Sequence, residues 1–180
     1  MIRTFFTSTK TVQRKAILRG ALKNFKTDPL LERQIAIPTP SQSLVGETRF
    51  RVRYAETDKM GVVYHSNFII WFEVGRVELL RQCGFQYRDM EKEDNCHIAV
   101  VDVHIRYKTP AYYDDEILVR TRLKGVHRSL LHFEYEVLRA TDQTLLAQGE
   151  TTHLVVDDKF QRRPLPQKYM AAFTQGRSPG

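Results

Sequence analysis

Cysteine is scarce in this sequence and long apolar runs are missing, and each shortage excludes a class of protein. The chain of 180 residues has only Cys83 and Cys96, which are too few and too poorly spaced for a disulfide framework or a zinc site. No apolar run approaches the ~20 residues that a helix needs to span a bilayer. We therefore expect a globular domain of ordinary size with two reduced thiols.

Motifs of several common active sites are also missing. The six histidines show neither HxH nor HExxH spacing, so no metal site is expected. The sequence contains no GxSxG elbow, no Walker loop and no GxGxxG turn. A catalytic site in this chain would need another arrangement of side chains.

Acidic residues are missing from the first 27 positions, and most of the net charge of +7 lies in this N-terminal part of the chain. Residues 1–45 carry eight Lys or Arg against two acidic residues, whereas residues 46–180 carry twenty against nineteen. The basicity belongs to an N-terminal extension and not to a face of the folded domain. No nucleic-acid partner is therefore expected.

The extension, residues 1–45, has the composition of an organelle transit peptide, because it is Arg-rich, acid-free at its start and amphipathic in KAILRGALKNF. The same composition fits a basic arm, a helix with weak contact to a membrane surface, or an upstream start codon chosen wrongly. Prolines then favour an extended linker up to the domain at residues 46–175, and residues 176–180 read as a flexible tail. The expected location is the cytoplasm, or a mitochondrion or plastid if residues 1–27 are a transit peptide.

Hydrophobic periodicity predicts one strand, one long helix and four more strands. Residues 47–57 alternate between apolar side chains and arginines, which is typical of a half-buried strand. Residues 66–84 predict a helix that Ser66 or Asn67 caps and that Gly84 ends in a left-handed turn. A polar loop is expected at 86–95, further strands at 96–107, 116–127, 130–140 and 145–156, and a short helix at 165–173.

This order of elements predicts an α+β fold, with an antiparallel five-stranded sheet wrapped around one long central helix. The connections TPAYYDDE, HRS and ATDQT suit antiparallel hairpins. Strands at ~3.3 Å per residue are long enough to curl around a helix that rises 1.5 Å per residue. Residues 68–72 are apolar on all sides, so we expect the helix start to be buried by the sheet or by a partner subunit.

The stretch YAETDKMGVVYHSNF, residues 54–68, places polar residues directly before this helix. Gly61 permits a tight turn and close approach of a ligand to the backbone. Backbone N–H groups around His65–Phe68 form the positive end of the helix dipole, and the turn can bring the Asp58 carboxylate back toward them. A carboxylate beside such donors can hydrolyse an activated acyl group, because it activates water or attacks directly while the donors bind the oxyanion. An ordinary turn or capping aspartate is the alternative.

The stretch YAETDKMGVVYHSNFIIWFEVGRVELLR resembles the signature of the 4-hydroxybenzoyl-CoA thioesterase family, in particular its YbgC/FadM-like acyl-CoA thioesterases. The shared pattern is an aromatic residue, Thr-Asp, Gly-Val-Val-Tyr-His, Asn, an aromatic residue, and then Glu, Arg and Glu along the helix. The resemblance extends over residues 47–172 and implies the hotdog fold. It also implies hydrolysis of acyl-CoA without a bound cofactor, in a homodimer or homotetramer whose active sites lie between subunits.

The resemblance implies that Asp58 is the catalytic carboxylate, as nucleophile or general base. It also implies that the backbone N–H of His65 polarises the thioester carbonyl. Another branch of the superfamily carries its catalytic carboxylate on the central helix, where Glu73 is the competitor. An ion pair between Glu73 and Arg76 is the structural alternative for that residue.

The same resemblance names candidate binding residues. Gly61 and Val62 would line the approach of the acyl group, with Tyr64 as a further substrate-binding residue, and Asn67 would help hold the loop. Arg128, in the turn GVHRS, would face the phosphates of CoA; a solvated surface arginine is the alternative.

Two other functions remain open at this point. One is a hydratase or dehydratase acting on acyl thioesters, although no histidine–acid pair stands in the context that such relatives use. The other is a non-enzymatic acyl-CoA-binding or scaffold protein. The acyl chain that would be bound is not indicated by the sequence.

Overall fold

The predicted strands form one antiparallel sheet in the computed structural model, which describes residues 44–175. The strands are β1 (Val45–Arg51), β2 (His97–Tyr107), β3 (Glu116–His127), β4 (Leu130–Arg139) and β5 (Leu145–Val156), in the spatial order β1-β3-β4-β5-β2. The helices are α3 (Asn67–Gln82), α4 (Tyr87–Asp94) and α5 (Gln167–Gln175), with a short 3-10 helix η1 (Tyr54–Glu56) before α3. The predicted basic arm, most of the linker and the C-terminal tail lie outside the described residues.

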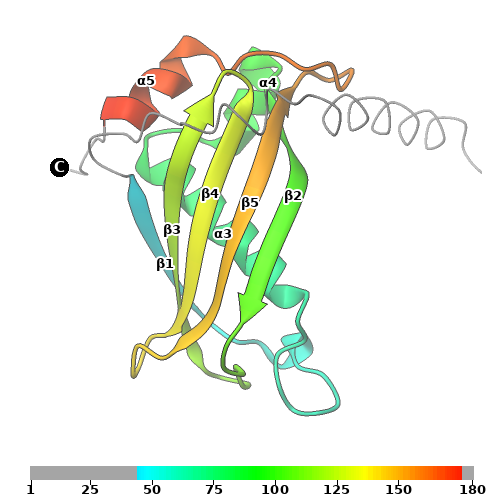
Figure 1. The fold of residues 1–180 in the computed structure, drawn as a ribbon, viewed down its shortest axis with the longest axis vertical. Helices are drawn as coiled ribbons and strands as arrows, with labels where there is room; N and C mark the ends of the chain where they lie inside the picture. The colour runs from blue at the N-terminus through cyan, green and yellow to red at the C-terminus, as the bar shows by residue number, and fades with distance from the viewer. Residues whose placement is uncertain (1–43, 176–180) are drawn as a thin grey trace, which may run out of the picture.

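Helix α3 lies against one face of the sheet, behind the strands in the view of Figure 1, and contacts β1, β3 and β4. Helices α4 and α5 cover one end of the molecule, and the loop between η1 and α3 lies at the opposite end (Figure 1). The predicted α+β fold with a five-stranded antiparallel sheet is therefore confirmed. No helix within residues 44–175 is both long and apolar enough to span a membrane.

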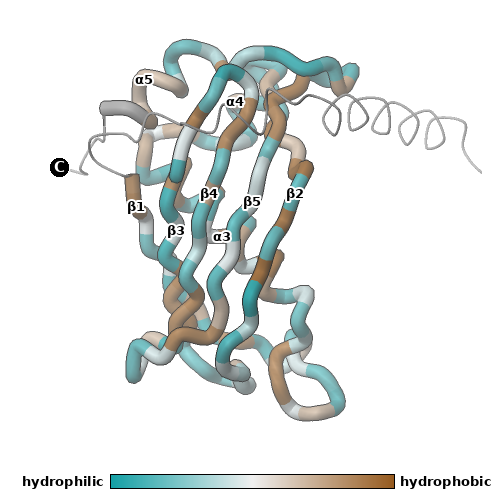
Figure 2. Tube along the Cα trace, viewed as in Figure 1, coloured by the Kyte–Doolittle hydropathy of each residue, from teal (hydrophilic) through white to brown (hydrophobic). Residues whose placement is uncertain are grey.

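Alternating side chains give the sheet its buried face. On β4, Phe133, Tyr135 and Val137 are at most 2 % exposed, while Glu134 and Glu136 between them remain partly exposed on the other face. Figure 2 shows the same alternation of hydrophobic and hydrophilic residues along the strands. The period of two seen in the sequence therefore places the apolar side chains toward α3.

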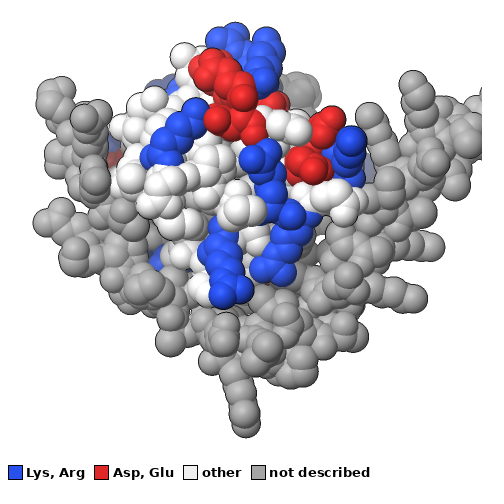
Figure 3. Space-filling model, turned by 90° about the horizontal axis from the view of Figure 1, so that it is seen from above, with Lys and Arg blue, Asp and Glu red and all other residues white. Residues whose placement is uncertain are grey.

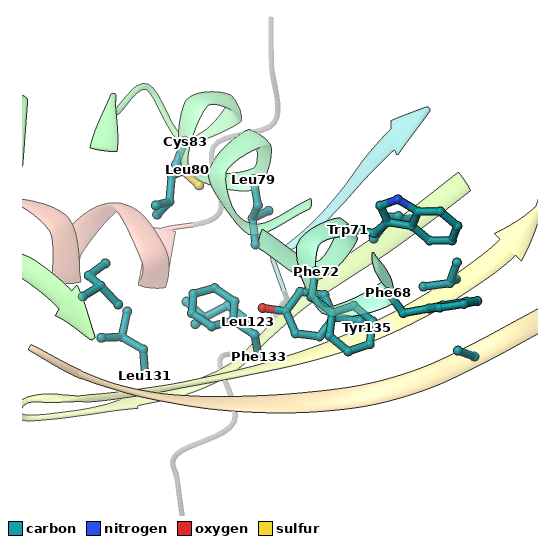
Figure 4. Packing of buried hydrophobic residues seen from close by; sticks show 14 of the residues in the cluster. Phe68, Trp71, Phe72, Leu79, Leu80, Cys83, Leu123, Leu131, Phe133 and Tyr135 are labelled. Carbon is teal, nitrogen blue, oxygen red and sulfur yellow. The ribbon is translucent and has the colours of Figure 1, made fainter. Parts of the chain in front are cut away.

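The residues of α3 complete this core. Trp71 and Phe72 are buried, and Figure 4 shows the Phe72 ring against Tyr135, with 4.3 Å between ring centroids. Gly75 lets the helix backbone approach β3, because a Cβ at this position would lie 2.4 Å from Thr121 Oγ1. The helix thus packs against the sheet through one glycine and several large side chains.

Two predictions about the elements were wrong. The first strand ends early and turns into η1, so Tyr54 is 80 % exposed instead of half-buried. The polar segment before β2 forms helix α4, which the buried side chain of Met90 holds to the core. Ile69 and Ile70 are 41 % and 48 % exposed, so within one chain the sheet buries only one face of the first turns of α3, and the expected burial by a partner subunit stays a prediction.

The prediction that TPAYYDDE joins two paired strands was also wrong. Strand β2 pairs with β5, as in His97 with Val156, while β3 lies between β1 and β4. The turns HRS and ATDQT do join neighbouring strands, and Gly84 ends α3 with a φ of +86°, as predicted. The partner of β2 could not be read locally, because it lies far along the chain.

Candidate active site

The loop between η1 and α3 folds back on itself at Asp58. The backbone N–H of Asp58 donates to Val62 O at 2.9 Å, and the N–H of Gly61 donates to Asp58 O at 2.9 Å. Gly61 has a φ of +77°, a left-handed conformation that other residues rarely adopt. A bridge between Thr57 and Val63 closes the base of this turn. The tight turn expected at Gly61 is present and fixes the backbone of Asp58.

The Asp58 carboxylate is partly buried, and one of its oxygens is engaged. Oδ1 accepts a hydrogen bond from the backbone N–H of Met60 at 2.8 Å. No other group within residues 44–175 donates to this carboxylate. One oxygen therefore orients the side chain, while Oδ2 keeps free lone pairs that can accept a proton or attack a carbonyl carbon.

The start of α3 carries a backbone donor without an acceptor. The N–H of Asn67 donates to Tyr64 O at 2.9 Å, and that of Ile69 donates to Ser66 O at 3.1 Å. The N–H of His65, by contrast, has no acceptor in the part of the chain that the structure describes. It lies at the positive end of a helix of 16 residues, where an oxyanion is stabilised.

The side chains of Ser66 and Asn67 do not cap α3, so that prediction was wrong. Ser66 occupies the N-cap position, but its hydroxyl makes no capping hydrogen bond. Asn67 Nδ2 instead donates to Glu56 O at 2.7 Å, and the N–H of Tyr64 donates to the same carbonyl at 2.9 Å. Asn67 therefore ties the helix start to the segment that precedes Asp58.

Glu56 is a candidate that the sequence pattern did not single out. It is only 4 % exposed. Oε1 accepts hydrogen bonds from Trp71 Nε1 at 3.1 Å and from the Arg53 guanidinium at 3.0 Å, and Oε2 accepts one from the Arg53 backbone N–H at 2.7 Å. Burial pushes the pKa of Glu56 upward, but the hydrogen bonds from Arg53 and Trp71 outweigh burial and hold the pKa below its ordinary value. Glu56 is therefore ionised inside the protein.

Aromatic rings surround the helix start. The His65 ring lies 4.3 Å from Tyr64 and 6.4 Å from Tyr107, measured between centroids. Tyr107 Oη donates to His65 O at 3.0 Å, and burial raises the pKa of this hydroxyl, which favours the protonated donor. Tyr107 ends β2, so the sheet edge fixes the His65 carbonyl. Nothing near residues 54–68 in the sequence indicated this contact.

The expected binding residues Gly61, Val62 and Tyr64 lie in the same loop as Asp58. Gly61 is exposed at the tip, and nothing lies within 4 Å of a Cβ placed there. Val62 is partly buried through a bridge with Tyr112, and Tyr64 is 48 % exposed. The loop thus has accessible backbone at its tip, and aromatic side chains lie at its base.

Arg128 is not brought together with Asp58 within one chain. It lies in the turn between β3 and β4, at the end of the sheet opposite the loop, and it is exposed with a φ of +52°. Its carbonyl accepts a hydrogen bond from the N–H of Leu165 at 3.0 Å. Figure 3 looks onto this end and shows basic side chains beside acidic ones instead of a face of one sign.

Glu73 and Arg76 do not form the ion pair that was the alternative for Glu73. Glu73 is exposed on α3, whereas Arg76 is 8 % exposed. Within residues 44–175 no carboxylate lies at ion-pair distance from Arg76. Those residues also contain no group of three His, Cys, Asp or Glu that could hold a metal ion.

The chain is similar to known proteins over most of the described residues. Residues 52–173 match the thioesterase-like superfamily. A relative in Bacillus subtilis, the putative acyl-CoA thioesterase YneP, is 37 % identical over 113 residues, which cover 63 % of this chain and 80 % of YneP. The acyl-CoA thioester hydrolase YbgC of Escherichia coli O157:H7 is 32 % identical over 126 residues, which cover 69 % of this chain and 92 % of YbgC.

A solved structure extends the likeness to three dimensions. The DHNA-CoA thioesterase of Staphylococcus aureus matches with a TM-score of 0.69 and 32 % identity, over 73 % of this chain and 89 % of that one.

Proposed function

The chain belongs to the thioesterase-like superfamily, and from that premise we propose that it hydrolyses acyl-CoA thioesters to a free carboxylic acid and CoA. The observation that carries the proposal is the loop geometry. Asp58 is oriented by the N–H of Met60 and keeps one oxygen free, and its loop ends at the unpaired N–H of His65. A carboxylate and a backbone donor are the two groups that thioester hydrolysis needs from the protein.

In the general-base route, Asp58 Oδ2 takes a proton from water while the water oxygen adds to the thioester carbonyl carbon. The negative charge that develops on the carbonyl oxygen is stabilised by the His65 N–H and the helix dipole. The C–S bond then breaks, and the CoA sulfur leaves with a proton. No cofactor or metal takes part in this sequence of steps.

In the nucleophilic route, the Asp58 carboxylate itself attacks the carbonyl carbon and expels CoA thiolate. Water then hydrolyses the acyl-aspartyl anhydride, which restores the carboxylate. The free oxygen of Asp58 serves either route. Rapid-quench trapping of the acyl-Asp58 anhydride in a single turnover distinguishes them, because only the nucleophilic route forms this covalent intermediate.

A second copy of the chain is part of the proposal. Strand β2 forms one edge of the sheet, and the exposed residues Ile69 and Ile70 lie on the first turns of α3. A homodimer that covers this region, or a homotetramer built from such dimers, would bury the apolar helix start. Arg128 of a second copy could then approach a CoA bound at Asp58, which Arg128 of the same chain does not.

The proposed location is the cytoplasm.

The decisive experiment compares wild type with Asp58→Asn for CoA release from acyl-CoAs ranging from acetyl to long-chain and aromatic groups. The thiol signal is corrected for Cys83 and Cys96. We expect kcat to fall at least ~10²-fold with CoA binding retained, because a group used only in the transition state is lost. Asp114→Asn, a change in an exposed loop acid, is the matched control.

Each other outcome contradicts the proposal in a specific way. Activity that survives in Asp58→Asn would move catalysis to Glu73 or elsewhere. A wild type that binds acyl-CoA without releasing CoA would be a binding protein, and one that hydrates enoyl-CoA would be a hydratase.

A further inference from the structure

We propose that Glu56 is a positioning residue, which holds the Asp58 loop at a fixed place relative to the start of α3. The inference rests on the proposed thioesterase function. Glu56 precedes Asp58 by two positions, and both of its carboxylate oxygens are engaged by Arg53 and Trp71, so its effect would pass through Asp58.

The side chain of Glu56 supplies one half of the attachment. Its carboxylate oxygens accept from Trp71 Nε1 at 3.1 Å and from the Arg53 N–H at 2.7 Å. Trp71 is 1 % exposed and belongs to the buried face of α3. The segment leading to Asp58 is therefore bonded to the helix core by a buried carboxylate.

The backbone carbonyl of Glu56 supplies the other half. It accepts from the N–H of Tyr64 at 2.9 Å and from Asn67 Nδ2 at 2.7 Å. Tyr64 and Asn67 flank His65, whose free N–H is the proposed oxyanion donor. One residue is thus bonded to both sides of that donor, so its position sets the separation between the donor and Asp58.

Stability alone is a weak reason to bury a carboxylate here. A buried charge costs free energy in desolvation, and well-packed apolar replacements of buried ion pairs are often neutral or stabilising. The Arg53 side chain is 73 % exposed, so its ion pair with Glu56 contributes little. What the carboxylate provides beyond an apolar side chain is direction, because its two oxygens accept from fixed donors on different segments.

The chain provides its own optical probe of this attachment. Trp71 is the only tryptophan, and its indole N–H is bonded directly to Glu56. Tryptophan fluorescence therefore reports the environment of this carboxylate without any label.

The test is a kinetic double-mutant cycle of Glu56→Gln and Asp58→Asn. We expect Glu56→Gln alone to lower kcat by about 10- to 10²-fold with KM changed less than about 3-fold, since a small misplacement of a catalytic group has effects of this size. In the Asp58→Asn background the same change should cause no further loss, because the residue acts through Asp58. The matched control is Glu47→Gln, which removes an exposed carboxylate from β1.

Two structural measurements accompany the cycle. Trp71 emission should shift in Glu56→Gln and not in Glu47→Gln. Amide hydrogen exchange of residues 57–66 should become faster in Glu56→Gln while the strands keep their protection. If Glu56→Gln does not fold, Glu56→Asp, which keeps the charge and shortens the reach, replaces it throughout.

Several results would overturn the inference. One is full kcat in folded Glu56→Gln; another is a loss of equal size in the Asp58→Asn background, which would indicate a general structural role. Failure of the proposed function looks different, because wild type then releases no CoA or Asp58→Asn remains fully active. In that case hydrogen exchange decides: unchanged exchange in residues 57–66 overturns the positioning role, and faster exchange supports it.

Discussion

Two polar clusters in the described part of the domain, one around the buried Glu56 and one between α3 and the sheet, differ in how completely their hydrogen bonds are formed. In the loop cluster (Arg53, Glu56, Tyr64, Asn67 and Trp71), both carboxylate oxygens and the carbonyl of Glu56 have partners. The inner-face cluster (Arg76, Tyr135, Thr151 and His153) lies between α3 and the sheet. There the Tyr135 hydroxyl is 2.9 Å from Thr151 Oγ1, which is 2.7 Å from His153 Nε2, but Arg76 Nε and His153 Nδ1 have no partner.

The difference in hydrogen bonding agrees with the different roles of the two clusters. An unsatisfied buried polar atom costs about 1–3 kcal/mol, so the inner-face cluster gives up stability that an apolar core would keep. The loop cluster gives up little, and it stands where the position of Asp58 has to be fixed. The loop cluster therefore holds the proposed site in place, whereas the inner-face cluster only fills the core. Three perturbations test this contrast.

The largest effect is expected for Glu56→Leu, which leaves the indole N–H of Trp71 and the backbone N–H of Arg53 without an acceptor. The free energy of unfolding should fall by about 2–3 kcal/mol, since the buried indole N–H and the partly buried N–H of Arg53 lose their acceptor. Urea unfolding followed by Trp71 fluorescence measures it. Glu47→Leu, on the exposed face, should stay within about 0.5 kcal/mol. A loss below about 1 kcal/mol for Glu56→Leu would show that the hydrogen bonds of the loop cluster contribute little to stability.

An intermediate effect is expected from acid acting on the inner-face cluster. Burial, together with the positive charges of Arg76 and His132, lowers the pKa of His153 from 6.5 to about 3. Between those values the unfolded chain binds a proton that the folded chain does not, so stability is complete above pH 6.5 and declines as the pH falls. From pH 6.5 to 5 the loss from this group should be about 2 kcal/mol.

Urea unfolding of wild type and His153→Gln across this pH range measures that loss. Glu56 has its pKa lowered from 4.5, so its stabilising effect is lost only below that value, and the two clusters respond in different windows. His132 also has a pKa lowered by burial, and the difference between the two proteins removes its contribution. Parallel pH curves for wild type and His153→Gln would contradict the assignment.

The smallest effects come from one substitution made at two sites. Thr151 and Thr121 are both buried on the inner face, but Thr151 Oγ1 is bonded to two side chains while Thr121 Oγ1 has no partner. Thr151→Val should destabilise by about 1.5 kcal/mol, whereas Thr121→Val should be neutral or slightly stabilising, because it removes an unsatisfied hydroxyl. Thermal unfolding of the pair measures the difference, and equal losses would show that hydrogen bonding does not separate the sites.

Most of the fold could be predicted from the sequence, because strands β3, β4 and β5 alternate over the middle of their length and are joined by short turns. The limits 116–127 and 145–156 agree with the observed strands. Helix α4 was missed, because Met90 is its only fully buried residue and the segment therefore reads as a polar loop. The place of β2 was missed because pairing with β5 is a property of the whole sheet.

The candidate site was only partly predictable. The turn at Gly61 and the position of Asp58 before α3 followed from local chemistry. The burial of Glu56 did not, because it depends on Trp71, which lies 15 residues further along the chain. Asn67 looks like a capping residue in the sequence, but its amide finds a better acceptor in the carbonyl of Glu56.

The edge position of β2 also constrains how the protein is made. During synthesis, β2 is complete at Tyr107, but its neighbour β5 begins only at Leu145. Until the ribosome has delivered β5, neither edge of β2 is paired with another described strand, and the apolar face of α3 lacks part of its cover. Unpaired edges and uncovered apolar surface are what chaperones bind and what nascent chains aggregate through. We therefore expect this chain to be most prone to aggregation while the last third of the domain is being translated.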